Sequence, residues 1–361
     1  MSDGFRLRAV RESMAKDGVK ALLVTHLPDV RWLCGFTGSN AALALTPKNA
    51  VLFTDGRYTV QAKQETHGAR VVLAKKSALK EACALLQSLA KHASYNPEHT
   101  TVAELAMMRS AITVKARRGF FSALERPLIS ELRMVKDAEE LQMMEKAAAM
   151  GDRVFDAVLP HIQSGVPETE IAASLEFFAR SMGAEAMSFE TIVASGKRSA
   201  LPHGRPSATR IPRNGFITLD FGVILKGYCS DMTRTVGVGR LNREERAAYD
   251  AVLEAQEAGV AAVKPGATCG EVDEAARAVL RKAGLARYFT HSTGHGVGLE
   301  IHEAPRLAAG QMLELKPGTV VTVEPGIYLA GKFGIRIEDM VAVTQRGNKV
   351  LTKASKALIE L

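Results

Sequence analysis

Two five-residue stretches, TLDFG at residues 218–222 and TVEPG at residues 322–326, share one layout in the second part of the chain. Each places a carboxylate at the end of an apolar run rich in β-branched residues. Each also lies downstream of a helix signal of the form Gly-x-x-x-x-Glu-aliphatic, GVPETEI at 165–171 and GATCGEV at 266–272. Because these features recur in the same order, the sequence predicts an internal repeat of two related halves.

Each half supplies a second carboxylate. Asp231 follows Asp220 by eleven residues, and Glu338 follows Glu324 by fourteen. His295, in the segment STGHGVGLEIHE, adds an imidazole. A lone Asp after a strand is usually a turn residue, and a lone His is usually structural. Their joint occurrence instead favours a site for two divalent cations, which needs several anionic ligands.

The donor atoms indicate which metal such a site would prefer. Four carboxylates stand beside one imidazole, and oxygen-rich sites suit manganese or magnesium, whereas imidazole and thiolate favour zinc, cobalt and iron. We therefore expect two Mn²⁺ ions, with Co²⁺, Zn²⁺ or Fe²⁺ as alternatives.

Several other polar residues accompany the predicted ligands. His203 in LPHG, His291 and His302 are not among the predicted metal ligands, and they are candidates for contact with a substrate. Arg336 lies two residues before Glu338, so in a strand both side chains would point to one face. Tyr228 lies three residues before Asp231. We expect Arg336 and Tyr228 to support the ligands, as partners of metal carboxylates commonly do.

Composition bounds the class of protein. A chain of 361 residues exceeds what one core usually supports, so two domains are expected. Apolar content of 47% and charged content of 24% are typical of a soluble globular protein. The net charge of +8 is spread along the chain, and its densest basic cluster, at 115–118, is short and lacks aromatic residues. Nucleic acid is therefore not an expected partner.

The cysteines and the hydropathy of the chain indicate where the protein is expected to be located. Cys34, Cys83, Cys229 and Cys269 show no metal or redox spacing, which indicates reduced thiols. The first eighteen residues are amphipathic and charged without an apolar signal segment, and no stretch reaches membrane-spanning length. We expect a cytoplasmic protein with no membrane partner.

The first third of the chain alternates helix and strand signals and predicts an α/β domain. Helices are expected at 5–17, 57–67 and 79–92, and strands at 21–24, 41–45, 51–53 and 71–74. A long helix should begin at Asp137, with Glu140 three positions on as its capping-box partner. The predicted domains are residues 1–130 and 131–361.

The motifs together resemble a known family. Residues from about 132 to the end are similar to the metallopeptidases that include methionine aminopeptidase, aminopeptidase P and prolidase, whose catalytic domain has the "pita-bread" fold. FTGSN at 36–40 and LFTDGRY at 52–58 extend the similarity to the bacterial aminopeptidase P and prolidase branch. The resemblance implies a creatinase-like α/β domain followed by an α+β pita-bread domain with a pseudo-two-fold repeat.

The resemblance also implies a role for each predicted ligand. Asp220 would chelate one metal, and His295 with Glu324 would bind the other. Asp231 and Glu338 would bridge the pair. Each of these positions holds the residue type that the family pattern requires.

The same resemblance places His203, His291 and His302 around a proline-containing peptide and implies a homodimer. Their presence argues against the family's non-enzymatic members. A binding protein that kept the fold without catalysis is still an alternative, because fold alone does not give function.

Substrate chemistry then follows. A bond before proline is a tertiary amide without an N–H donor. A metal-bridging hydroxide would supply the nucleophile at neutral pH. We assign Glu324 to proton transfer toward the leaving nitrogen, and His203 and His302 to the carbonyl on which charge develops.

Substrate length separates two activities. Aminopeptidase P removes the first residue of Xaa-Pro peptides, and prolidase cleaves only Xaa-Pro dipeptides, so it must recognise the proline carboxylate. Arg306, four residues after His302, resembles a carboxylate-binding arginine of prolidases, although a solvated loop arginine is equally compatible. FTGSN and FTDGRY favour aminopeptidase P. We expect an Xaa-Pro aminopeptidase, with prolidase as the alternative.

Overall fold

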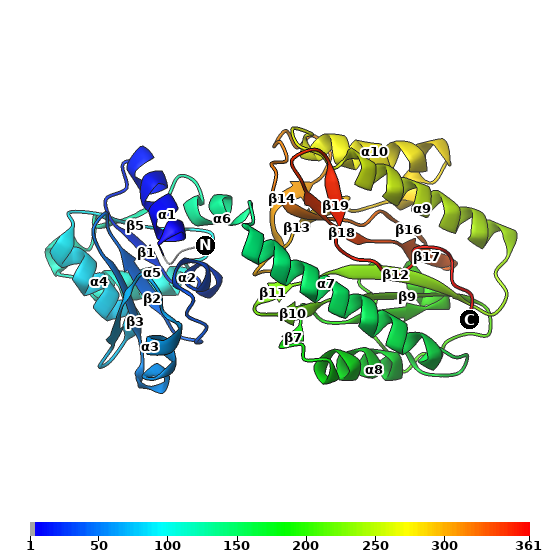
Figure 1. Ribbon diagram of the computed structural model, residues 1–361, viewed down its shortest axis with the longest axis horizontal. Helices are drawn as coiled ribbons and strands as arrows, with labels where there is room; N and C mark the ends of the chain where they lie inside the picture. Colours follow the sequence, from blue (N-terminus) through cyan, green and yellow to red (C-terminus); the bar gives the residue numbers. More distant parts are fainter. Residues whose placement is uncertain (1–3) are drawn as a thin grey trace. The chain divides into compact units, whose positions relative to one another are not determined.

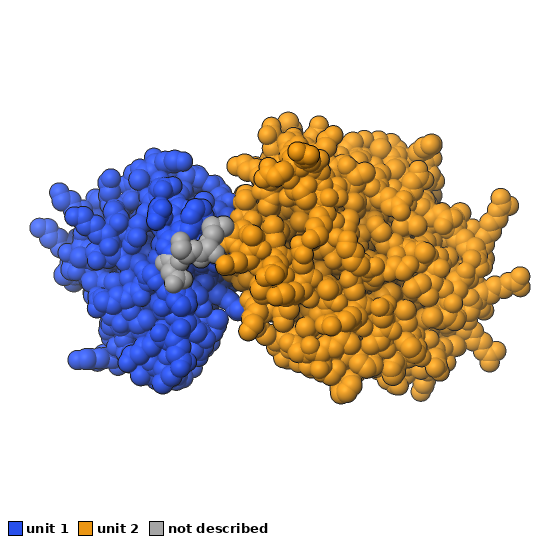
Figure 2. Space-filling model, in the orientation of Figure 1, with its two compact units in different colours: residues 1–133 blue, residues 134–361 orange. Residues whose placement is uncertain are grey.

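The chain divides into two compact units, residues 1–133 and 134–361 (Figure 2). A computed structural model describes residues 4–361, so the first three residues of the predicted N-terminal domain lie outside the description. The expected domain boundary at residue 130 falls within helix α6 (Leu128–Arg133), which ends the first unit. Among residues 4–361, no helix is both long enough and apolar enough to cross a membrane.

The first unit is built on a six-stranded sheet with the strand order β4-β3-β2-β1-β5-β6. Its strands are β1 (Leu22–Val24), β2 (Ala42–Leu45), β3 (Ala50–Thr54), β4 (Arg70–Leu73), β5 (Ala93–Tyr95) and β6 (Phe121–Ala123). Every residue of β1, β2 and β3 is buried, whereas the edge strand β4 is partly exposed. Buried apolar runs of this kind are expected where helices cover both faces of a sheet.

Helices complete the first unit. They are α1 (Phe5–Lys16), α2 (Leu27–Cys34), α3 (Gln61–Glu65), α4 (Ala78–Leu89) and α5 (Val102–Ser110), followed by α6. Ala82, Cys83 and Leu86 of α4 are buried in one cluster with residues of the sheet such as Leu23 and Phe53. The first unit is therefore an α/β domain, as predicted from the alternating pattern.

The second unit contains two helix pairs and the strands between them (Figure 1). The first pair is α7 (Ala138–Val158) and α8 (Glu168–Ser181), and the second is α9 (Arg243–Ala262) and α10 (Cys269–Lys282). Apolar residues of α7 and α8 share a core with β9 (Gly215–Phe221) and β12 (Met232–Val238). Residues of α10 share another with β15 (Val320–Val323) and β18 (Asp339–Val343).

Two sheets dominate this unit. One has the order β12-β9-β8, and the other has the order β14-β13-β15-β18-β19. The remaining strands are β8 (Ile192–Ser195), β13 (Gly294–Gly296), β14 (Glu303–Leu307) and β19 (Asn348–Val350). A smaller sheet, β11-β10-β7, and the hairpin β16-β17 complete it, with β7 (Ala186–Met187), β10 (Val223–Leu225), β11 (Tyr228–Cys229), β16 (Gly326–Leu329) and β17 (Phe333–Arg336).

The internal repeat is visible in the backbone before α8 and α10. Gly165 and Gly266 adopt left-handed φ angles of +90° and +78°, which favour glycine. The N–H of Gly165 donates to Ile211 O, and the N–H of Gly266 donates to Leu315 O, both at 2.9 Å. Each helix is therefore entered through the same turn, and the predicted repeat is confirmed.

Helix α7 begins as its sequence predicts. The side chain of Asp137 accepts hydrogen bonds from the backbone N–H groups of Glu139 and Glu140, and the Glu140 carboxylate accepts one from the Asp137 N–H. A capping residue of this kind is worth about 1 kcal/mol. The box fixes where the helix starts and leaves Glu140 buried at its first turn.

One predicted helix is wrong in extent. The segment 57–67 was expected to be a single helix, but it forms a 3₁₀ turn at Gly56–Tyr58 and the short helix α3. Asp55 explains the turn, because its carboxylate accepts the backbone N–H of Arg57 at 3.0 Å and also binds the Arg57 side chain. Local side-chain bonds of this kind compete with a regular helix.

Candidate active site

Ten of the eleven residues predicted for the site line one cavity of about 660 Å³ in the second unit. The four carboxylates occur at strand ends or beside them. Asp220 lies near the end of β9 and Asp231 directly precedes β12, while Glu324 follows β15 and Glu338 directly precedes β18. Strand pairing within each half therefore delivers two carboxylates to the cavity.

His295, on β13, brings the imidazole to these carboxylates. Its Nε2 atom lies 3.6 Å from Asp231 Oδ2 and 3.5 Å from Glu324 Oε1. Ligand atoms of Asp231, His295 and Glu338 all lie within 4.8 Å of one another. The Nδ1 atom of His295 lies 2.9 Å from the carbonyl oxygen of Gly296, so an N–H there leaves the Nε2 lone pair directed at the carboxylates.

Burial makes this arrangement unfavourable for the carboxylates alone. It raises the pKa of Asp231 well above the ordinary value, and repulsion from Glu338 raises that pKa further. Burial and the charge of Glu324 act in the same direction on the pKa of Glu338. Burial also raises the pKa of Glu324 to about 8. Cations between these groups would offset the repulsion and keep the carboxylates ionised.

The contacts of Asp220 fit a metal ligand. Its Oδ2 atom accepts a hydrogen bond from Arg336 Nη2. Its Oδ1 atom is buried and has no hydrogen-bond partner among residues 4–361. Because an unpaired buried carboxylate oxygen is costly, this atom calls for a partner such as a cation. The donor set as a whole, four carboxylates and one imidazole nitrogen, fits hard divalent ions.

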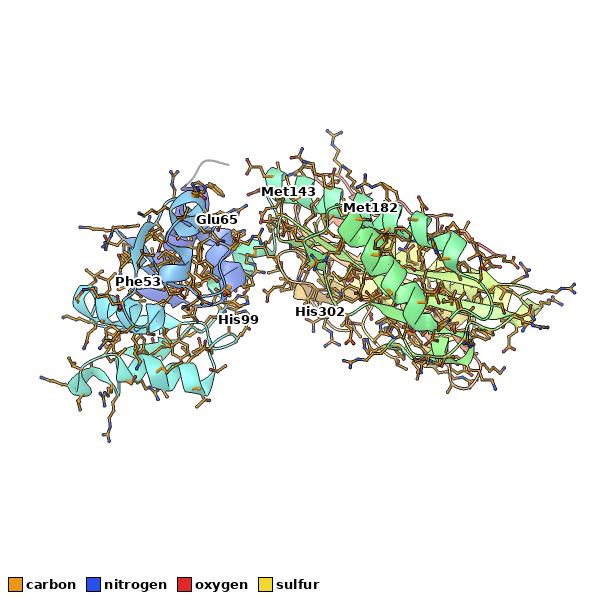
Figure 3. All side chains as sticks on the ribbon, turned by 90° about the horizontal axis from the view of Figure 1, so that it is seen from below. Phe53, Glu65, His99, Met143, Met182 and His302 are labelled. Carbon is orange, nitrogen blue, oxygen red and sulfur yellow. The ribbon has the colours of Figure 1, made fainter. Side chains whose placement is uncertain are left out.

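The three further histidines differ in the contacts that their rings make. His302 (labelled in Figure 3) packs its ring edge-on against His295, with 4.4 Å between centroids, and burial lowers its pKa. His203 lies in a loop that lines the same cavity. His291 has both ring nitrogens engaged, Nδ1 at 2.8 Å from Ser292 O and Nε2 at 3.0 Å from Tyr328 Oη. Burial lowers the pKa of His291 to about 4, so it is neutral near pH 7.

Arg336 links the ligands to their surroundings. Besides binding Asp220, its Nη1 atom donates to Tyr328 Oη at 2.7 Å and to the carbonyl oxygen of Pro202, next to His203, at 3.0 Å. Its Nε atom donates to Thr233 Oγ1 at 3.0 Å, and the Thr233 hydroxyl donates to Glu338 Oε2 at 2.7 Å. Arg336 thus contacts one candidate ligand directly and another through a hydroxyl.

Thr233 and Tyr328 are parts of the site that the sequence reasoning missed. Both carry hydroxyls that connect charged groups, Thr233 between Arg336 and Glu338, and Tyr328 between Arg336 and His291. Their short distance in the sequence from two predicted ligands could have identified them. Thr233 lies two residues after Asp231, and Tyr328 lies four after Glu324.

Tyr228, the eleventh predicted residue, has a different contact from the one expected. Its hydroxyl donates to Glu140 Oε1 on α7 at 2.8 Å, and both groups are buried. Strand β11 pairs with β10, against which α7 packs, so Tyr228 fastens that helix to the small sheet. The hydroxyl of Tyr228 thus contacts a residue of α7, and its expected support of a metal ligand stays a prediction.

Comparison with known proteins identifies the family. The family model for metallopeptidase family M24 matches residues 142–345, and the model for the creatinase/prolidase N-terminal domain matches residues 6–135. The chain belongs to metallopeptidase family M24. It is a metal-dependent peptidase with the pita-bread fold and a creatinase-like N-terminal domain, as the motifs indicated.

Relatives of this M24 peptidase match it along nearly the whole chain. The Xaa-Pro dipeptidase of Pyrococcus horikoshii is 35% identical over 355 residues, covering 98% of both chains. A solved Xaa-Pro dipeptidase from Bacillus anthracis is 39% identical, with a TM-score of 0.95 and full coverage of both chains. A solved X-Pro aminopeptidase from Thermotoga maritima is 36% identical, with a TM-score of 0.88 and coverage of 97% and 100%.

Proposed function

We propose that this M24 peptidase is an Xaa-Pro dipeptidase. The observation that carries the proposal is the place of Arg306. In the pairing of β13 with β14, Arg306 lies directly opposite His295, and residues opposite each other in an antiparallel pair project to the same face. Arg306 also lines the cavity and is exposed to it. A guanidinium there can bind the free carboxylate of a C-terminal proline.

This proposal reverses the order expected from the sequence, where aminopeptidase P came first. Two observations support the reversal. Arg306 shares a cavity wall with the candidate ligands, and relatives that match the full chain bear the name Xaa-Pro dipeptidase. A dipeptide of this kind carries an N-terminal amine at one end and the proline carboxylate at the other, so it needs one cationic and one anionic recognition group.

The ligand set proposed for two divalent cations, manganese in the first place, is Asp220, Asp231, His295, Glu324 and Glu338. Cobalt, zinc or iron(II) are the alternatives. When bound, such cations supply Lewis acidity and lower the pKa of a coordinated water. The predominance of carboxylates and the unpaired Asp220 Oδ1 atom support this assignment.

The other side chains then have separate tasks. Glu324, which lines the cavity beside the other candidate ligands, is assigned to accept a proton and pass it to the leaving proline nitrogen. His203 and His302 line the cavity beside the ligands and can donate to the carbonyl oxygen as charge develops. His291, with both nitrogens engaged, positions Tyr328 and through it Arg336.

The decisive experiment compares Xaa-Pro dipeptides with Xaa-Pro-Yaa tripeptides on the metal-loaded protein. The wild type should prefer dipeptides. Arg306→Ala should raise KM for the dipeptide about ten- to a hundredfold, the value of a charge-assisted pair worth roughly 1.5–3 kcal/mol, and spare the tripeptide. Arg205→Ala is the matched control, because Arg205 lines the same cavity but already pairs with Glu190 at 2.8 Å. A wild type that prefers tripeptides, with an unaffected Arg306→Ala variant, would refute the dipeptidase proposal.

The second candidate is an Xaa-Pro aminopeptidase. The similarity to the solved X-Pro aminopeptidase, with a TM-score of 0.88, favours it. In that case Arg306 is a solvated arginine, and the same comparison of substrates would show turnover of tripeptides. We also infer a homodimer from the family resemblance, which sedimentation of the metal-loaded protein would test.

A further inference from the structure

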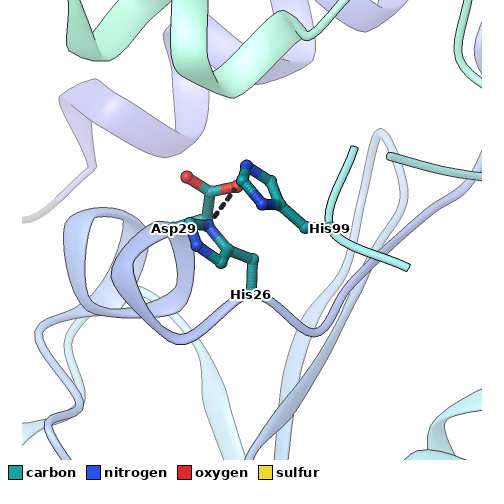
Figure 4. A group of neighbouring side chains, drawn as sticks. All are labelled: His26, Asp29 and His99. Carbon is teal, nitrogen blue, oxygen red and sulfur yellow. Dashed lines mark ion pairs between the residues drawn. The ribbon is translucent and has the colours of Figure 1, made fainter. Parts of the chain in front are cut away.

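A second cluster of metal-ligating side chains lies in the first unit, within a domain that supplies none of the proposed ligands. His26 precedes α2 and Asp29 lies in the first turn of that helix, while His99 belongs to the loop between β5 and α5 (Figure 4). Ligand atoms of the three residues all lie within 4.8 Å of one another. We propose that they form a binding site for one divalent cation of the zinc type.

The carboxylate of the cluster is held in place. Asp29 is buried, with 1% of its surface exposed, and its Oδ1 atom accepts a hydrogen bond from Arg133 Nη1 at 2.6 Å. The Oδ2 atom faces the ring of His26, 3.3 Å from Nδ1. Arg133 therefore orients the carboxylate as an outer partner, and Oδ2 remains directed toward the imidazoles.

The two imidazoles are stacked. The ring centroids of His26 and His99 are 3.6 Å apart, and the ring planes differ by 1°. An imidazole binds a metal in its own plane, through the lone pair of one nitrogen. Two parallel stacked rings cannot do so for one ion, so capture requires the His99 ring to turn out of the stack. His99 is partly buried and lies in a loop, outside any helix or strand.

There is also space for an ion beside these groups. A cavity of about 10 Å³, enough for about one water molecule, is lined by His26, Asp29, Asn96 and His99 together with apolar residues of the sheet and α6. The polar residues of its lining are the three proposed ligands, Asn96, Thr25 and Thr100. The cavity therefore has room for one cation in the place of a single water.

The donor set distinguishes this site from the catalytic one. Two imidazoles and one carboxylate favour zinc, cobalt, nickel or copper over manganese, whereas four carboxylates and one imidazole favour manganese. Binding would also tie the β5–α5 loop to the start of α2, two segments that are far apart in the sequence. The site would therefore act as a structural clasp of the first unit.

The test uses the full chain with the catalytic cluster disabled, so that its cations do not obscure the count. In a metal-stripped Asp231→Ala, His295→Ala, Glu338→Ala background, Zn²⁺ is titrated and bound zinc is counted by mass spectrometry after gel filtration. Any zinc that Asp220 and Glu324 still hold is common to all variants and cancels in the comparison. We expect His99→Ala to bind one zinc fewer per chain than its parent and to lose part of the zinc-dependent rise in Tm.

Two further variants in the same background keep the result interpretable. His92→Ala is the matched control, because His92 is an exposed histidine of the same unit that binds the carbonyl of Gly119 rather than the cluster. His99→Cys replaces one zinc ligand by another and should restore the lost ion. Equal zinc content in the parent and His99→Ala, an equal loss in His92→Ala, or a loss that His99→Cys does not restore would each overturn the proposal.

Discussion

Replacing Thr233 by valine removes one hydroxyl from the most connected part of the site while preserving the shape of the side chain. Thr233 is fully buried on β12, and its hydroxyl donates to Glu338 Oε2 at 2.7 Å and accepts from Arg336 Nε at 3.0 Å. Valine can do neither. Glu338 then loses the group that orients it, and Arg336 retains one N–H without a partner.

The expected size of the effect follows from these two bonds. A hydrogen bond to a charged group is worth about 1.5–3 kcal/mol, and loss of a partner behind a metal ligand typically costs ~10–100-fold in metal affinity or activity. We therefore expect the Mn²⁺ concentration for half-maximal activity to rise about ten- to a hundredfold. Thr233→Ser, which keeps the hydroxyl, should stay within a few-fold of the wild type.

The assay is peptidase activity against free Mn²⁺, with metal content measured in parallel. Thr218→Val is the matched control, because Thr218 is buried on the adjacent strand β9 and its hydroxyl pairs with that of Thr235 at 3.0 Å. That variant should lose stability without a change in metal dependence. If Thr233→Val shows the wild-type metal dependence, or Thr218→Val shifts it equally, the support assigned to Thr233 is wrong.

Three further predictions concern the ligands and the acid–base groups. Asp231→Ala or Glu338→Ala should lose at least one cation and nearly all activity while the circular dichroism spectrum is retained. Normal turnover with full metal content would refute their assignment as metal ligands. His203→Ala and His302→Ala should keep both cations and lower kcat by about two to four orders of magnitude, whereas loss of metal with normal turnover per metal would make either residue a ligand. In the metal-free chain, Tm should fall as pH rises from about 6.5 to 8, because Glu324, whose pKa burial raises to about 8, still holds a proton there that the unfolded chain has released. Below about 6.5 the effect is opposed by His291 and His295, whose pKa values burial lowers to about 4. A metal-free Tm that is constant or rises across that range would contradict the assigned burial, and the Mn²⁺-loaded protein is the control.

The elements that the sequence predicted well are those set by local rules. The start of α7 follows from a capping box within four residues, and the strands of the first unit follow from short apolar runs. Helix α2 was not predicted, and it has Pro28 in its first turn, where proline is favoured. Strands β5 and β6 were missed because they are three residues long and only partly buried.

In the site, the candidate ligands were found because charge at a strand end is visible in the sequence. The positions of Thr233 and Tyr328 were not, because their partners come from other strands. Thr233 on β12 meets Arg336 and Glu338, more than a hundred residues away in the chain. Such contacts depend on how the two halves come together, which neither hydropathy nor local propensity specifies.

The two halves of the internal repeat each supply part of the candidate cation site, and this has a practical consequence. Asp220 and Asp231 come from the first half of the repeat, and Glu324 and Glu338 come from the second. The exposed connection at 239–240, between β12 and α9, joins the two. A chain cut there would yield two fragments, each with half of a cation site, and peptidase activity would then report their association. The division of the site between the two halves therefore suits the chain to use as a split-enzyme sensor.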